Sequence, residues 1–332
     1  MKKTLRNYIY THCIVLMAVF TYSIEAQSIN SVAEILKDIE TVCIKADGSI
    51  EAAGFAVQEQ AKQLISIWDV ASSQIIVELE DRNKNFVYRY LLCEVLGFTK
   101  ENKAFNVLKN ILENKSENEM LRHRAARSIG RIGDKRAVQS LIIALDDKNH
   151  FVRMGAAKGL GMLKASEATD KLIQKLQHDN ENKEVSMRIC YALSRIKGSK
   201  SIDAMINLLS HNDPSYRYAG VRALGRIGDS KATISLINLL KKDKSIRKGE
   251  IIDALGKIGD KRAIESLIEE IKSNDPLSVG KAAEALLHLR ATGAIQYLIK
   301  AESIKRNKNS FTIRKLKKAI DELSKIRKNT ND

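Results

Sequence analysis

The chain has 332 residues, of which 44% are hydrophobic and 29% are charged, and its formal net charge at pH 7 is +16. This composition is that of a folded soluble protein and excludes a disordered, low-complexity chain. Two prolines and 5% aromatic residues favour long helices, because proline is the residue that most sharply stops a helix.

Residues 1–26 have the pattern of an export signal. A basic start is followed by an apolar stretch over residues 14–20, and Ala26 precedes a plausible cut before Gln27. The alternative is a retained membrane anchor, but the apolar stretch is far shorter than the roughly 20 residues needed to span a bilayer. We therefore expect a cleaved signal peptide and an exported protein of the periplasm or cell envelope.

Residues 27–80 are expected to form an N-terminal helical cap that includes a degenerate repeat around Ser66. The segment that starts at Ile29 has the apolar spacing of an amphipathic helix, and Asp47 and Gly48 end it. A solenoid needs such a terminal unit, because its outer side must face water.

A phrase close to LGxIGD recurs every 31 to 33 residues within residues 81–303. We take the first glycine of the phrase as the origin of each repeat, and two copies have another residue there. The seven origins are Gly97, Gly130, Gly161, Ser194, Gly225, Gly256 and Leu287. Such regular spacing indicates a stack of similar units and not an active site, which is built once.

Each copy carries apolar residues at three-and-four spacing on both sides of the phrase, which predicts two amphipathic helices, A and then B. An apolar pair lies 11 and 12 residues after most origins, and we expect it in a core shared by neighbouring hairpins. These pairs are Leu141–Ile142, Leu172–Ile173, Met205–Ile206, Leu236–Ile237, Leu267–Ile268 and Leu298–Ile299. Cys93 and Cys190 fill a position that is otherwise Ala, Val or Ile, so we expect both in the core.

The helix ends carry recognisable caps. Asp213 before Pro214, and Asp275 before Pro276, predict the starts of two A helices. At the end of helix A, glycine allows the left-handed conformation that closes a helix, and the following Gly-Asp opens helix B. We therefore interpret the repeated phrase as the corner of a helical hairpin.

Residues 304–332 predict a basic C-terminal capping helix and tail. Capping the stack is its expected duty. Its basic face is also a candidate for contact with an anionic membrane surface.

Two segments, RHRAARSIGRIGDKRAVQSLIIALDD from Arg122 and YRYAGVRALGRIGDSKATISLINLLKKD from Tyr216, resemble HEAT repeats of the short bacterial type first associated with phycobilisome lyases (PBS lyases). The resemblance implies an all-α fold, a right-handed α-solenoid of about seven to eight stacked helical hairpins. It also implies that B helices line the concave face, and that a basic residue of helix A pairs with acidic turn residues of neighbouring units. The residues at that position are Arg89, Arg122, Arg153, Arg217 and Lys248.

No catalytic residue, cofactor or metal site is predicted. Deoxyhypusine hydroxylases have similar repeats and bind two irons through His-Glu pairs, but none of the six histidines here is followed by glutamate. His150, His178 and His211 precede A helices of successive units. Stacked helices lie about 8–10 Å apart, so these side chains cannot share one ion through Zn–N bonds of about 2.0 Å. The three mature cysteines lack a C-x-x-C spacing, so neither zinc nor a redox pair is indicated.

The turns after the A helices are basic, and equivalent turns of a solenoid lie along one edge. This basic ridge consists of Arg131, Lys135, Arg136, Arg195, Lys197, Lys200, Arg226, Lys231, Lys257, Lys261 and Arg262. One interpretation is structural, because basic residues at helix C-termini satisfy free carbonyls and the helix dipole. The other is a face that attracts an acidic protein or an anionic envelope polymer.

A second candidate surface is a groove lined by B helices. Thirteen residues after the origin, four copies carry a polar residue suited to hydrogen bonding an extended peptide: Gln174, Asn207, Asn238 and Glu269. The alternative is a solvated helix face, which any amphipathic helix has.

These observations predict a non-catalytic, exported scaffold that binds a protein partner, with no small-molecule substrate. The alternative is binding of nucleic acid or an anionic polymer through the basic ridge. Export and the lack of interleaved aromatic residues argue against nucleic acid. A PBS-lyase-like or other HEAT-repeat enzyme is the remote alternative.

Overall fold

The computed structural model describes residues 32–45, 57–99, 103–178, 182–242, 248–305 and 310–329. Every regular element within these ranges is a helix, and no strand occurs among them. The predicted all-α solenoid is therefore confirmed, and its predicted right-handed sense stays a prediction. The export signal of residues 1–26 lies outside the described residues. None of the described helices has the length and apolar character that crossing a membrane requires.

The chain divides into two compact units, residues 1–163 and 164–332. This boundary lies inside the array that the sequence predicts as one domain. The helices of unit 1 are α2 (Val32–Lys45), α4 (Gln58–Ser66), α5 (Trp68–Glu80), α6 (Phe86–Thr99), α7 (Lys103–Glu113), α8 (Glu119–Ile132), α9 (Val138–Ala144) and α10 (His150–Leu163).

The helices of unit 2 are α11 (Thr169–His178), α12 (Lys183–Ile196), α13 (Ser199–Leu208), α14 (Pro214–Ile227), α15 (Thr233–Lys242), α16 (Lys248–Ile258), α17 (Ile264–Ile271), α18 (Pro276–His288), α19 (Ile295–Lys305) and α20 (Ser310–Asn329). Most B helices begin with a short 3₁₀ turn, such as Lys135–Ala137 before α9.

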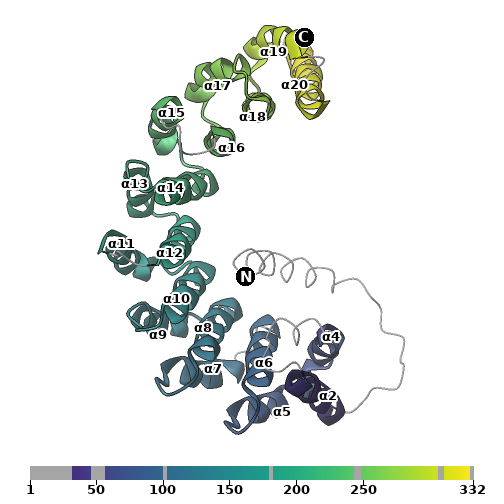
Figure 1. Cartoon of the computed structure of the whole chain (residues 1–332), viewed down its shortest axis with the longest axis vertical. Helices are drawn as coiled ribbons and strands as arrows, with labels where there is room; N and C mark the ends of the chain where they lie inside the picture. Colours follow the sequence, from purple (N-terminus) through teal and green to yellow (C-terminus); the bar gives the residue numbers. More distant parts are fainter. Residues whose placement is uncertain are drawn as a thin grey trace. The chain divides into compact units, whose positions relative to one another are not determined.

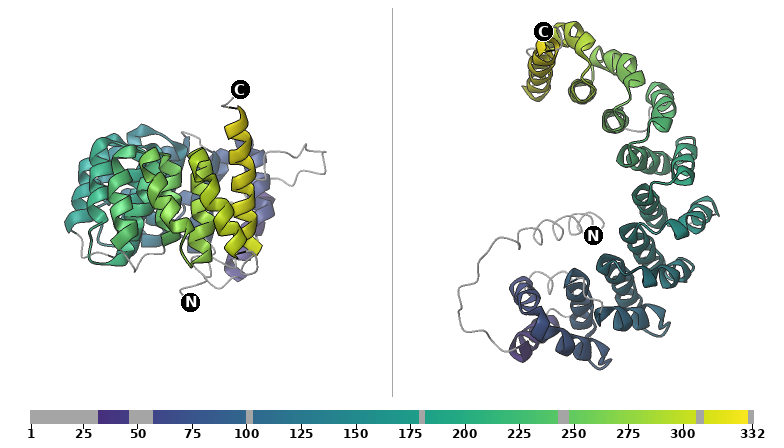
Figure 2. Two further views of the ribbon diagram at one scale, coloured as in Figure 1. Left: turned by 90° about the horizontal axis from the view of Figure 1, so that it is seen from above. Right: turned by 180° about the vertical axis from the view of Figure 1, so that it is seen from behind.

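Within each unit the helices form two rows (Figures 1 and 2). The A helices α6, α8 and α10 pack in succession in unit 1, and α12, α14, α16, α18 and α20 do so in unit 2. Successive B helices touch one another much less, and each packs mainly against A helices. Each unit is thus a stack of hairpins in which the A row carries most of the contact between repeats.

The origin glycines explain the tight A row. Gly130 lies inside helix α8, and a methyl group added there would lie only 2.3 Å from the Cα of Gly159 in α10. In unit 2, a methyl group at Gly225 would lie 2.9 Å from the Cα of Ala254. The first glycine of the phrase is therefore needed for close helix approach and does not close helix A.

The second glycine of the phrase closes helix A. Gly133, Gly228 and Gly259, three residues after their origins, have positive φ angles of 92°, 76° and 75°. In the three repeats that lack this glycine, Lys164, Lys197 and Arg290 adopt the same left-handed conformation. The corner interpretation is thus correct for the second half of the phrase. The next aspartate opens helix B, since Asp134 accepts a hydrogen bond from the Arg136 N–H at 2.8 Å.

The predicted caps and core are present. Asp213 and Asp275 cap α14 and α18, each with proline at the first helical positions. The first residue of every apolar pair has no exposed surface: Leu141, Leu172, Met205, Leu236, Leu267 and Leu298. Burying one such side chain stabilises the fold by about 1.5–3 kcal/mol. The second residue is buried or half-buried in five pairs, and Ile299 is exposed.

The two ends complete the stack. In unit 1, α4 contacts α6 and α5 contacts α7, which is the pattern of A and B helices elsewhere, and α2 packs against α4, α5 and α6. In unit 2, α20 takes the A position after α18 and also packs against α19. The predicted limits of the N-terminal cap and of the repeat array stay predictions.

We expect Gly130→Ala to lower the free energy of unfolding by about 2 kcal/mol, because overpacking against a neighbouring backbone outweighs alanine's helix propensity of about 1 kcal/mol. Urea unfolding followed by circular dichroism measures this change. Gly293→Ala is the control, because no heavy atom lies within 4 Å of a methyl group at that position. Equal unfolding midpoints for the two variants would show that the A row can separate without cost.

Candidate binding surfaces

The eleven residues of the basic ridge lie where A helices end and B helices begin. All are exposed or half-buried. Three belong to unit 1 (Arg131, Lys135 and Arg136) and the others to unit 2. Their exposure agrees with the sequence interpretation, so their roles depend on which partners they already have.

Most of the ridge arginines have structural contacts. Arg136 and Arg262 pair with the aspartates that open their own B helices, with Nε–Oδ2 distances of 2.8 Å. The Arg262 guanidinium holds the pKa of Asp260 at about 2. Arg131 lies 3.8 Å from the Phe98 ring centroid. Arg226 lies 5.1 Å from the Tyr191 ring and donates a hydrogen bond to Ser194 Oγ at 3.1 Å.

Two ridge lysines link neighbouring hairpins of unit 2. Lys200 Nζ lies 2.7 Å from Asp170 Oδ1, and Lys231 Nζ lies 2.5 Å from Asp203 Oδ1. Both pairs are at least half exposed, so each contributes only about 0–1 kcal/mol. Their position between repeats nevertheless favours the structural interpretation for these two lysines.

Four ridge lysines remain without a partner. Within the part of the chain that the structure describes, no ion pair or hydrogen bond of the side chains of Lys135, Lys197, Lys257 or Lys261 is found. The last three lie on the corners of unit 2. The binding role of the ridge stays a prediction, and these lysines are the residues most available for it.

The polar row of Gln174, Asn207, Asn238 and Glu269 is exposed on α11, α13, α15 and α17. Its predicted place on a concave face is wrong. In unit 2 the A helices follow the inner side and the B helices the outer side (Figures 1 and 2). The physical reason is the tighter spacing of the A row, since the closer row of a bent stack lies inside. A binding role for the polar row stays a prediction.

The basic residues of helix A pair with acidic turns in part of the stack. Arg89 bonds Glu117 with both guanidinium nitrogens, at 3.1 and 2.8 Å, and donates from Nε to Leu79 O. Arg122 pairs with Asp147, as the resemblance implies. Lys248 bonds Glu270 at 2.7 Å.

Two other basic residues of this series differ. Arg153 donates to the carbonyls of Asp147 and Lys148, and Arg217 to those of His211 and Asn212. These arginines hold the turn before their own helix.

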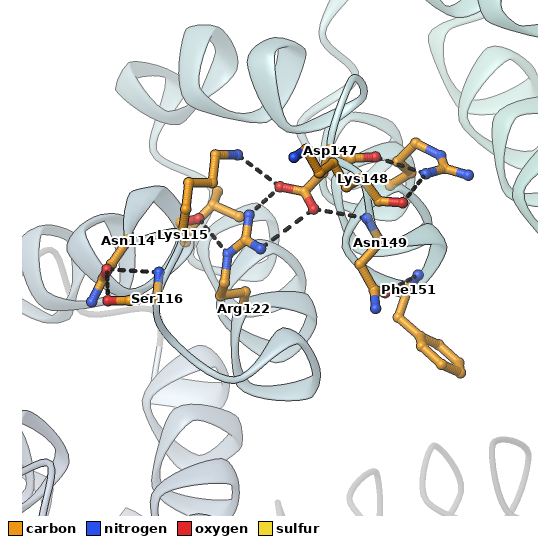
Figure 3. A network of polar contacts seen from close by, with 10 residues as sticks. Asn114, Lys115, Ser116, Arg122, Asp147, Lys148, Asn149 and Phe151 are labelled. Carbon is orange, nitrogen blue, oxygen red and sulfur yellow. Dashed lines mark hydrogen bonds and ion pairs between the residues drawn. The ribbon is translucent and has the colours of Figure 1, made fainter.

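Asp147 is the centre of the most extensive polar network (Figure 3). It accepts hydrogen bonds from Arg122, from Lys115 Nζ at 2.7 Å and from the Asn149 N–H at 3.0 Å. Its side chain is only 3% exposed. Burial alone would raise the pKa of Asp147, but the bonds from Arg122 and Lys115 hold that pKa at about 2. A charged Asp147 therefore stabilises this turn of unit 1.

The histidines and cysteines have structural surroundings. His123 Nδ1 lies 2.6 Å from Phe151 O, and the His211 ring stacks on Tyr216 at 4.2 Å. No group of three or more potential metal ligands occurs among the described residues. Cys43, Cys93 and Cys190 are buried free thiols. Burial raises their pKa, to about 12 for Cys43 and Cys190, so the expected core position of Cys93 and Cys190 is confirmed.

The sequence reading missed one cluster on the A-helix face of unit 1. Arg124, Arg127 and Arg131 of α8, here called the arginine patch, lie on the side of the helix away from the buried Ile129. Arg124 bonds Glu94 Oε1 at 2.8 Å and the Tyr90 hydroxyl, and its guanidinium lies 4.2 Å from the Tyr90 ring centroid. The three-and-four spacing of these arginines within one helix was the available signal.

We expect Asp147→Asn to lower the free energy of unfolding at pH 7 by about 3 kcal/mol, because it leaves buried Arg122 without its counter-charge. The pKa of Asp147 is lowered by folding, so its contribution is present above the ordinary value of 3.8 and is lost as the pH falls towards about 2. Urea unfolding at pH 7, 4 and 3 should therefore show a shrinking difference between the two proteins.

Asp170→Asn is the matched control, because Asp170 is 73% exposed in its pair with Lys200. Its effect should stay below about 0.5 kcal/mol at every pH. A difference for Asp147→Asn that stays constant down to pH 3 would contradict the assigned charge state.

Comparison with known proteins agrees with this architecture. The sequence matches HEAT repeats over residues 105–182 and 169–255, and the PBS lyase HEAT-like repeat over residues 248–272. Among curated proteins, no sequence match was found. The chain is similar to the structure of Kap121p, with 13% identity, a TM-score of 0.58, and coverage of 89% of this chain and 38% of that chain.

Two smaller proteins are similar over nearly their whole length. YibA of Escherichia coli has 19% identity and a TM-score of 0.54, with 82% of this chain and 99% of that chain covered. A chain of the CpcE–CpcF complex of phycocyanin lyase from Nostoc sp. PCC7120 has 21% identity and a TM-score of 0.44, with 76% and 94% covered. The last likeness is too distant to support an argument, and the others support the fold alone. The chain is thus a HEAT-repeat protein with a repeat of the PBS lyase HEAT-like type, and its helical scaffold fits a protein-binding role.

Proposed function

We propose that this protein is an exported, non-catalytic scaffold that binds an acidic protein partner through the corners of unit 2. The observation that carries the proposal is the set of exposed lysines without partners on these corners: Lys197, Lys257 and Lys261. The other charged residues described on the ridge are largely occupied by contacts within the stack. Unpaired lysines at the edge of an interface attract an acidic surface and speed its association.

An acidic protein fits these corners better than nucleic acid does. Sequence-independent binding of single strands needs a basic track together with aromatic faces on which bases stack. Two aromatic rings lie beside the ridge, but the guanidinium of Arg131 covers Phe98 and that of Arg226 covers Tyr191. The rings are therefore already used within the protein. Nucleic acid or an anionic envelope polymer is the alternative that the binding experiment also tests, and a PBS-lyase-like enzyme remains the remote one.

The C-terminal helix α20 supports a capping role more than membrane contact. Its apolar residues Leu316, Ala319 and Leu323 are buried, and the helix packs against α18 and α19. Contact with an anionic membrane would therefore use only its exposed lysines, without insertion of apolar side chains.

A pull-down from envelope extract tests the proposed surface. We expect Lys197→Glu/Lys257→Glu/Lys261→Glu to reduce recovery of the partner about tenfold, because like charges replace attraction with repulsion. The matched control is Lys241→Glu/Lys242→Glu/Lys300→Glu, which makes the same change in charge at exposed positions away from the corners. Equal recovery by both variants would remove the ridge from the proposal. Recovery of nucleic acid or polymer in place of protein would favour the alternative.

Export has its own test. We expect N-terminal sequencing of protein from the envelope fraction to begin at Gln27, because a signal peptidase would cut after the small residue Ala26. Cell fractionation gives the compartment. An intact Met1 form in the cytoplasm would contradict export and revive the nucleic-acid alternative.

A further inference from the structure

Arg127 breaks a pattern of ion pairs that joins successive A helices. Three residues before the origin, an acid in three other repeats pairs with a base on the next A helix. These pairs are Glu94–Arg124, Asp253–Lys281 and Glu284–Lys315. In the repeat of α8, the same position is Arg127, and the corresponding position on α10 is Gly155. The pattern therefore leaves a basic group where the stack elsewhere has an acid, opposite a residue without a side chain.

Arg127 also lacks a partner of another kind. It is half-buried, and its Nε has no hydrogen-bond acceptor among the described residues. Arg124 Nε, one helical turn before it, has none either, although the other nitrogens of Arg124 bond Glu94 and Tyr90. Two buried guanidinium donors thus point to a missing acceptor, since buried charged donors are normally satisfied.

The local charge agrees with this conclusion. Burial lowers the pKa of Arg127 to about 10, and the nearby charge of Arg124 lowers it further. That pKa still leaves the guanidinium charged at pH 7. Glu94 is the one carboxylate among the described groups with the largest effect on it, and Glu94 already pairs with Arg124.

We propose that Arg127, assisted by Arg124 Nε, binds a carboxylate of an acidic segment of a second protein. A planar carboxylate matches the fork of a guanidinium and can accept two parallel hydrogen bonds. The neighbouring bond between Arg124 and Glu94 has this chemistry. The site lies in unit 1, so it goes beyond the corners of unit 2 and can fail or hold independently of them.

A carboxylate is favoured over a nucleic-acid phosphate by the rings around the arginine patch. The Tyr90 ring is covered by Arg124 at 4.2 Å and the Phe98 ring by Arg131 at 3.8 Å. Bases therefore find no free aromatic face beside Arg127 on which to stack. One buried guanidinium suits a single side-chain carboxylate better than a continuous chain of phosphates.

Isothermal titration calorimetry with hexaglutamate peptide tests the proposal on the purified protein. We expect Arg127→Met to weaken binding about tenfold or more, because it removes the charge while keeping the apolar stem. Arg127→Lys, which keeps the charge but loses the fork, should show an intermediate loss. Arg82→Met is the matched control in unit 1, because Arg82 is exposed, and it should bind as the unmodified protein does.

Thermal unfolding of each variant confirms that it is folded before binding is compared. The proposal would be overturned by equal binding of Arg127→Met and Arg82→Met, or by no detectable binding of hexaglutamate to the unmodified protein. An oligothymidylate that binds more tightly than hexaglutamate and depends on Arg127 would assign the site to nucleic acid instead. If only the triple lysine variant of unit 2 loses peptide binding, the corners hold and the Arg127 site fails.

Discussion

The structure depends on the close approach of successive A helices. Gly130 and Gly159 let α8 and α10 meet backbone to backbone, and Gly225 with Ala254 does the same for α14 and α16. A larger residue at these positions would separate two hairpins, whereas the B helices have no comparable contact. The difference in spacing between the rows places the A helices on the inner side of unit 2. It therefore decides which side chains an inner face presents.

Charge is used differently in the two units. In unit 1, the pairs Arg89–Glu117 and Arg122–Asp147 are nearly buried, whereas in unit 2 the pairs of Lys200 and Lys231 are largely exposed. Arginine suits the buried pairs, because its planar fork forms two bonds to one carboxylate and is less strongly hydrated than an ammonium. Removing one partner of a buried pair costs about 3–5 kcal/mol, but an exposed pair contributes about 0–1 kcal/mol. A buried arginine without a partner is therefore unusual in unit 1.

Local chemistry made much of the fold predictable. Helix pairs, the caps at Asp213 and Asp275, and the buried leucine series follow from spacing and residue type alone. The role of Gly130 did not, because it depends on Gly159, which only the stacking register brings near. The left-handed conformation of Lys197 was hidden, since the repeat lacks the glycine that marks it elsewhere.

The candidate surfaces were predictable only in composition. Counting basic residues in the turns identified the ridge but could not separate Arg226, which covers Tyr191, from Lys257, for which no partner is found in the described part of the chain. The contact of Arg131 with Phe98 spans one repeat, so it was visible in principle as a spacing of 33 residues. The inner or outer place of the B helices required the relative spacing of the two rows, which no single repeat contains.

Within one chain of repeats, variation between copies separates structural from functional positions. The stack needs the same residue type wherever it repeats a contact, as at the origin, where a small residue stands in six of seven copies. Three residues before the origin the copies instead have Glu94, Arg127, Lys158, Tyr191, Arg222, Asp253 and Glu284. This position lies on the face of helix A away from the core, so packing does not fix its identity. Where an acid stands there, the next helix can supply a base, but Gly155 supplies none to Arg127. The charge at Arg127 is therefore not explained by the stack that repeats around it, and a ligand from outside the chain is the remaining way to satisfy it.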